Sequence, residues 1–169
     1  SASAVSNAVT GMVPAPITPP QVVQTAAPVF ADASTRPLTI SFPNPVKAGN
    51  LILVSMASTQ GHTYNFTLSD NKNAGNYTWY QTDACQTTCA GWFYMVAQKG
   101  GSSFTIAATG GAAQSLVMSA IEVSNFDTTI FDGKPVTANG AGTSATSGTS
   151  ASASKQTASA NSLVLSVYG

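Results

Sequence analysis

The sequence predicts an all-β sandwich preceded by an extended N-terminal arm. Short runs rich in β-branched and aromatic residues recur along the chain, and turn-forming residues separate them. No segment shows a convincing helical periodicity. A length of 169 residues suits one domain, with some chain left for an arm. We therefore expect an arm over residues 1–31 and a sandwich over residues 32–169.

The arm is expected from its composition. Residues 1–31 are rich in Ala, Val, Thr and Pro, and they contain no charged residue. Prolines fix φ and remove backbone donors, which disfavours a long helix and favours extended backbone. Apolar side chains late in the segment suit burial better than solvent, while an unstructured leader or linker is the alternative.

Eight runs after the arm are candidate strands. The run 115–124 is the most ambiguous, since Leu116, Ala120 and Val123 could share a helix face, but its β-branched content favours a strand. The low-complexity tract 139–160 is a loop, a Ser/Thr-rich site for sugars or a polar edge strand. The expected strands are 38–42, 50–58, 63–69, 77–82, 91–98, 103–109, 115–124 and 162–168.

The charge content excludes two classes of partner. Charged residues form 7% of the chain, against roughly 25% in soluble domains, and the formal net charge is +0. The six Lys and Arg residues are scattered, so no basic stripe faces phosphates or anionic lipid. No apolar run is long enough to cross a bilayer. We expect neither nucleic acid nor membrane insertion, and a neutral surface rich in hydroxyl groups.

The two cysteines point to an oxidising compartment. Cys85 and Cys89 have a spacing that suits a small disulfide loop. A zinc site would need further ligands, and His62 is the single histidine of the chain. The chain begins with Ser1 and carries no signal-peptide pattern, so we expect a processed, secreted protein with no metal and no cofactor.

Catalytic patterns are not evident in the sequence. His62 has no nucleophile motif to accompany it, and the sequence brings no two carboxylates to a working separation. Residues 70–76 contain oxygen ligands but include Lys72 and lack the Glu of an EF-hand, so a turn is favoured over a structural calcium site. We expect no enzymatic activity.

Several short motifs carry a resemblance to a known class of proteins. They are 46–54 (VKAGNLILV), 70–71 (DN), 76–77 (NY), 104–106 (FTI) and 121–124 (IEVS). With them, residues 38–169 resemble Ig-like or jelly-roll sandwiches of secreted bacterial and phage-related surface proteins. The resemblance implies an Ig-like or jelly-roll module of an adhesive, carbohydrate-contacting or structural extracellular protein, with no catalytic residues to carry over.

Aromatic residues gather in the middle third of the chain. Successive side chains of a strand alternate between faces, so Trp92 and Tyr94 cannot share a face with Phe93. Some of these rings must lie outside the first core, where they form a platform for sugar rings or a protein contact unless a second apolar layer covers them. The candidate aromatic surface is Trp79, Tyr80, Trp92 and Tyr94; the possible N-glycosylation sites are Asn65 and Asn76.

These features lead to a structural hypothesis. Runs such as 51–54 and 117–123 are apolar on both faces, so something must cover the second face, and we expect the strand 162–168 to lack a partner from its own chain. We expect a non-enzymatic subunit of an extracellular assembly, such as a pilus-like filament, a surface layer or a particle. In it, the proline-free stretch 21–27 adds a strand to a neighbouring copy. The arm residues are Gln21, Val22, Val23, Gln24, Thr25, Ala26, Ala27, Val29 and Phe30, and the possible acceptor strand has Leu163, Val164, Leu165 and Val167.

The alternative hypothesis is a carbohydrate-binding or adhesion module of a secreted glycoprotein, with the arm as a linker and surface carbohydrate as the partner. An arm that packs on its own chain would favour this alternative.

Overall fold

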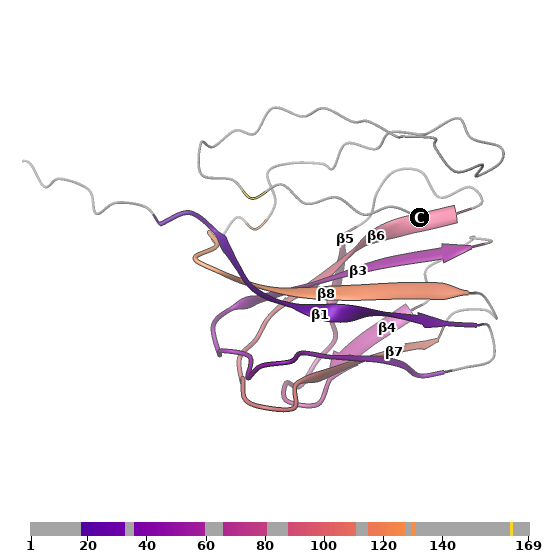
Figure 1. Ribbon diagram of the computed structural model, residues 1–169, viewed down its shortest axis with the longest axis horizontal. Helices are drawn as coiled ribbons and strands as arrows, with labels where there is room; N and C mark the ends of the chain where they lie inside the picture. Colours follow the sequence, from indigo (N-terminus) through magenta and orange to yellow (C-terminus); the bar gives the residue numbers. More distant parts are fainter. Residues whose placement is uncertain are drawn as a thin grey trace, which may run out of the picture.

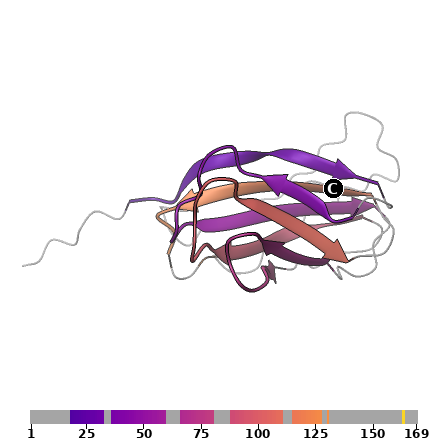
Figure 2. The ribbon, with the colours of Figure 1, turned by 90° about the horizontal axis from the view of Figure 1, so that it is seen from below.

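The computed structural model describes residues 18–32, 36–59, 66–80, 88–110, 115–127, 130 and 163. Within these residues the chain forms two antiparallel sheets and no helix, which confirms the predicted all-β sandwich. The two sheets face each other across a shared core (Figures 1 and 2). The strands are β1 (Gln21–Ala31), β2 (Leu38–Ser41), β3 (Leu51–Thr59), β4 (Phe66–Asp70), β5 (Thr78–Tyr80), β6 (Thr88–Val96), β7 (Thr105–Gly110) and β8 (Leu116–Ser124).

The strand order is that of a jelly roll. One sheet has the order β1-β8-β3-β6-β5, and the other has the order β2-β7-β4. The pairs β1·β8, β2·β7 and β3·β6 are therefore nested, as when one long antiparallel ribbon folds over into two sheets. A backbone hydrogen bond of 3.0 Å from Tyr77 N to Leu68 O continues the ribbon between β4 and the start of β5. An Ig sandwich would instead place its first, second, fifth and fourth strands in one sheet.

The main core lies between the two sheets and follows from the alternation of side chains along each strand. Every second residue of β3 and β8 points toward the smaller sheet, whose own alternate residues point back. Each fully buried aliphatic side chain stabilises the fold by about 1.5–3 kcal/mol. The central members are Ile40, Ile52, Val54, Met56, Leu68, Phe104, Ile106, Leu116 and Met118.

A second apolar cluster lies on the outer face of the five-stranded sheet. Leu51 and Leu53 of β3 and Val123 of β8 are buried there, although their neighbours in sequence face the main core. Trp92 and Tyr94 pack against this cluster from β6. These contacts explain why the run 51–54 is apolar at successive positions. In the run 117–123, Val123 belongs to this cluster and Ile121 packs against it, whereas Val117 is 43% exposed.

The segment expected as a detached arm contains strand β1 of this same sandwich. Gln21–Ala31 pairs antiparallel with β8 of its own chain, at the edge of the five-stranded sheet. Two register shifts interrupt the pairing, and Pro28 lies within the second, where its missing N–H does no harm. The sandwich therefore begins before residue 32, and the proposed donor stretch 21–27 pairs within its own chain.

The remaining expected strands after the arm match the observed ones to within a few residues at each end, up to β8. The expected strand 162–168, with Val164, Leu165 and Val167 of the possible acceptor site, lies outside the described residues. Leu163 is described and is 37% exposed.

Candidate functional site

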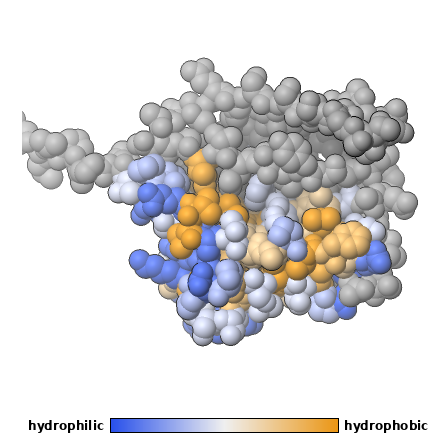
Figure 3. Space-filling model, viewed as in Figure 1, coloured by the Kyte–Doolittle hydropathy of each residue, from blue (hydrophilic) through white to orange (hydrophobic). Residues whose placement is uncertain are grey.

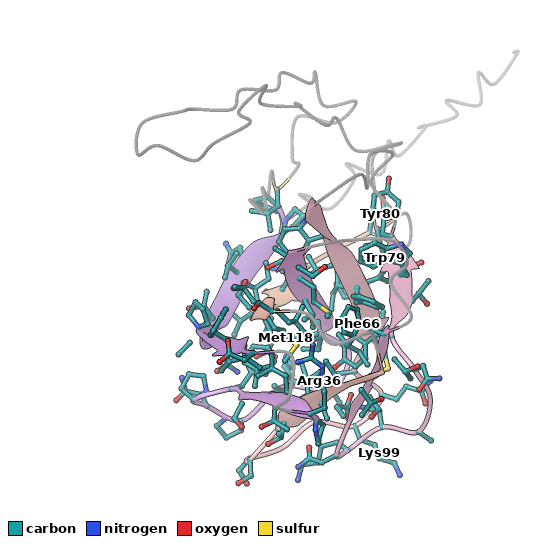
Figure 4. All side chains as sticks on the ribbon, turned by 90° about the vertical axis from the view of Figure 1, so that its right-hand side faces the viewer. Arg36, Phe66, Trp79, Tyr80, Lys99 and Met118 are labelled. Atoms are coloured by element: carbon teal, nitrogen blue, oxygen red, sulfur yellow. The ribbon has the colours of Figure 1, made fainter. Side chains whose placement is uncertain are left out.

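The register between β5 and β6 separates the candidate aromatic residues onto two sides of the sheet. Tyr80 pairs with Trp92, and Thr78 pairs with Tyr94, whereas Trp79 pairs with Phe93. Phe93 is buried in the main core, so Trp79 lies on the core side. Tyr80, Trp92 and Tyr94 form the outer set, which we call the aromatic face. In Figure 4, Tyr80 projects from the sandwich, and Trp79 lies nearer to the core.

Trp79 has a packing role that removes it from the candidate binding surface. Its ring lies 4.6 Å from the ring of Phe93, centroid to centroid, with the planes tilted by 51°. The same ring covers Gly91, where an added Cβ would approach a carbon of the indole to 2.1 Å. A glycine in the strand thus makes room for the aromatic ring of the edge strand next to it.

Hydroxyl groups continue the aromatic face across the sheet. Ser55 of β3 lies opposite Trp92 on one side and opposite Ser119 of β8 on the other. The two serine hydroxyls are 2.6 Å apart and share a hydrogen bond. A row of Tyr80, Trp92, Ser55 and Ser119 therefore crosses four strands.

The aromatic face is neutral. None of the described outward side chains on β3, β5, β6 and β8 carries a charge. Burial raises the pKa of Tyr80 above its ordinary value, and the nearby phenol of Tyr94 raises it further. The Tyr80 phenol therefore stays protonated at physiological pH, and this face can offer rings and hydroxyl groups without attracting ions.

A buried carboxylate lies at one end of the sandwich. Glu122 of β8 is fully buried, and its Oε1 accepts hydrogen bonds from Lys47 N at 2.8 Å and from Asn50 Nδ2 at 2.7 Å. Its Oε2 accepts one from Gln24 Nε2 at 2.5 Å. Gln24 also exchanges two hydrogen bonds with the backbone of Asn44. We call Glu122, Gln24, Asn44, Lys47 and Asn50 the carboxylate network.

The carboxylate network explains a local irregularity of β1. The register shifts between Val22 and Gln24, so that Val23 is the extra residue of a bulge. This bulge turns Gln24 inward to the carboxylate, while Val22 lies opposite Val123. The sequence signal for the network was a single Glu within an apolar strand, but its partners come from two distant segments.

A second polar cluster organises the turn after β4. Asp70 Oδ1 accepts hydrogen bonds from the backbone N–H groups of Lys72 and Asn73, at 2.8 and 2.7 Å. The Asn73 side chain in turn accepts from Lys99 N at 2.7 Å. Tyr77 donates its hydroxyl proton to Asp70 Oδ2 at 3.1 Å. Burial raises the pKa of Tyr77 far above its ordinary value, and the charge of Asp70 adds to this effect.

Several other candidates fall wholly or partly outside the described residues. Cys85 is one of them, and so are His62 and Asn65. The backbone of Cys89 pairs with Ser58 in the β3·β6 ladder, but its side chain is not described. Asn76 of the second sequon is exposed in the loop before β5.

The described residues contain no group of three or more His, Cys, Asp or Glu side chains that could hold a metal ion. In the same part of the chain, no helix has the length and apolar character needed to cross a membrane. Comparisons with protein family models, with curated proteins and with solved structures find no match to this chain.

Proposed function

We propose that this protein is a non-enzymatic carbohydrate-binding module of a secreted protein and that the aromatic face binds a neutral polysaccharide. The proposal rests on one observation: Tyr80, Trp92 and Tyr94 lie on the outer side of two adjacent strands, β5 and β6. Ser119 continues the same side of the sheet on β8, and the buried Ser55 between it and Trp92 shares a hydrogen bond with it. The proposal thus uses the aromatic residues on that side of the sheet and excludes Trp79.

The chemistry of sugars fits such a face. A pyranose ring has an apolar side of C–H groups, which packs on an aromatic ring, and an equator of hydroxyl groups, which pairs with polar side chains. A neutral face has no attraction for uronic acids or sulfated sugars beyond that of any uncharged surface. We therefore expect a preference for neutral hexose polymers.

The placement of β1 supports this choice over the filament hypothesis. A donated strand needs a neighbour with a free sheet edge, but the stretch 21–27 pairs with β8 of its own chain. The donor stretch is therefore engaged within its own chain, while the expected acceptor strand 162–168 lies outside the described residues. Association between copies must rest on a different surface.

The non-enzymatic part of the proposal is supported by the roles of two carboxylates. Glu122 is fully buried and accepts three hydrogen bonds from its own fold. Asp70 holds the turn after β4. Neither carboxylate lies on the aromatic face, so a sugar bound there would not meet these potential acid or base groups.

Retention of the full chain on insoluble polysaccharides tests the proposal. We expect binding to cellulose, chitin or mannan and little binding to polygalacturonate. Trp92→Ala and Tyr80→Ala should each weaken retention at least tenfold. Thr67→Ala is the matched control, since Thr67 is exposed on β4 in the other sheet.

Two results would overturn the proposal. One is that none of the neutral polymers retains the protein. The other is that Thr67→Ala weakens retention as much as Trp92→Ala, because retention would then not depend on the aromatic face. Circular dichroism of each variant separates lost binding from lost fold, and Tyr80→Ala serves as the milder change because β5 is an edge strand.

A further inference from the structure

Exposed apolar side chains gather at the two ends of β1. Val22 and Val23 are 42% and 51% exposed near its start, and Phe30 is 62% exposed near its end. Val117 of β8, directly opposite Phe30, is 43% exposed. Figure 3 shows separate apolar areas on the side of the molecule that carries these strands. Large side chains of this kind favour contact with another surface.

The middle of β1 differs from its ends. Thr25 and Ala27 are exposed but small, and Ala26 between them is buried. The whole strand, QVVQTAAPVFA, has no charged residue. A partner with a marked charge would find no complementary group here, whereas a second copy of the same neutral strand would meet no repulsion.

The edge of β1 is not suited to a continuous backbone ladder. Pro28 lacks an N–H group, and the two register shifts bend the strand. These are features that protect edge strands from open-ended pairing. A contact at this edge must therefore rely on side chains at the ends of the strand.

Symmetry provides a simple way to satisfy both ends together. If two β1 strands lie side by side and antiparallel, the Phe30 end of one meets the Val22 and Val23 end of the other. One two-fold axis near Ala27 then creates both contacts, and the contact closes on itself. A head-to-tail contact would leave one apolar end of each copy open.

We infer that two copies of this chain associate through antiparallel β1 strands about such a two-fold axis. The inference rests on β1 and stands independently of the carbohydrate proposal. An axis normal to the five-stranded sheet places the aromatic faces of both copies on the same side of the dimer. A polymer with repeated sites could then engage both faces, which raises its apparent affinity through effective concentration.

Sedimentation velocity of the full chain over a concentration series, from micromolar to millimolar, tests the association. We expect a monomer–dimer equilibrium, with the dissociation constant raised at least tenfold by Phe30→Lys and by Val23→Lys. Thr67→Lys is the matched control, since Thr67 is exposed on β4 in the other sheet. A monomer throughout the series would overturn the inference, as would an equal effect of Thr67→Lys.

A cysteine cross-link tests the symmetry. In a two-fold contact Ala27→Cys lies beside its own copy, so the oxidised variant should form a disulfide-linked dimer, with the bond located by peptide mass spectrometry. Thr39→Cys, exposed on β2, should not cross-link. Val23→Cys and Phe30→Cys can link in the double variant under either arrangement, so a Val23–Phe30 link with no dimer of Ala27→Cys is the outcome that would overturn the two-fold arrangement. Phe30→Lys is expected to bind soluble short oligosaccharides as the unchanged protein does, because one short sugar engages a single aromatic face. Loss of the dimer can thus be distinguished from loss of sugar binding.

Discussion

The side-chain amide of Gln24 donates a hydrogen bond of 2.5 Å to the buried carboxylate of Glu122, a residue 98 positions away. This contact fixes the register of β1 on β8, because a shift by one residue would turn Gln24 to the outer face and leave one carboxylate oxygen without this donor. The edge strand is therefore held by a specific polar contact as well as by the burial of small side chains such as Ala26 and Ala31.

Loss of the carboxylate network should destabilise the fold. We expect Glu122→Ala to lower the free energy of unfolding by about 3–5 kcal/mol. The change leaves Gln24 Nε2, Lys47 N and Asn50 Nδ2 without their acceptor. Gln24→Ala should cost about 1–3 kcal/mol, since the carboxylate keeps two other donors. Urea denaturation measures both values. Gln21→Ala, exposed on the same strand, is the control, and a cost for Gln24→Ala no larger than the control's would contradict the assigned role.

A methyl group at Gly91 should collide with Trp79. The added Cβ would lie 2.1 Å from the indole, so the ring must move, and we expect Gly91→Ala to cost about 1–3 kcal/mol. In a Trp79→Leu background the same change should cost much less. Thermal or urea denaturation of the double-mutant cycle checks the coupling, and equal penalties in both backgrounds would show that Trp79 is not the obstacle.

The buried Tyr77 phenol predicts a loss of stability in alkaline solution. Its pKa in the folded protein is raised above the unfolded value of 10.0, mainly by burial, so the folded state holds the proton more tightly. This contribution is fully present below pH 10 and decreases as the unfolded chain starts to ionise, by at most about 1.4 kcal/mol per pH unit. Tyr77→Phe should flatten the dependence between pH 9 and 11. Urea titrations at several pH values compare the two proteins, and parallel curves would contradict the prediction.

The disulfide between Cys85 and Cys89 stays a prediction from the sequence. Intact mass before and after reduction should differ by two hydrogen atoms. Because the loop is short, Cys85→Ser with Cys89→Ser should cost about 2 kcal/mol, toward the low end for native disulfides. Two free thiols that react with an alkylating reagent in the native protein would refute the bond.

The period-two pattern was enough to predict the fold class and the positions of most strands. It also predicted that Trp92 and Tyr94 lie on the other face of the sheet from Phe93, because alternation within one strand is a local property. The side chosen by Trp79 depends on the β5·β6 register and on the space above Gly91, neither of which a local pattern contains. The assignment of β1 failed for a similar reason: its prolines and neutral composition resemble an arm, and its partner is far away in sequence.

The nested pairing also bears on how the protein reaches its native state. Strands β1 and β8 are close partners in space but among the most distant in sequence, so much of the chain must be made before the five-stranded sheet can close. Topologies dominated by such long-range contacts fold slowly, within milliseconds to seconds. At about 5–20 residues per second, a ribosome would need roughly 5–20 s to pass from Gln24 to Glu122. During that interval β1 is a neutral, apolar segment without its partner, and Pro28 is the residue that would keep nascent copies from pairing with one another.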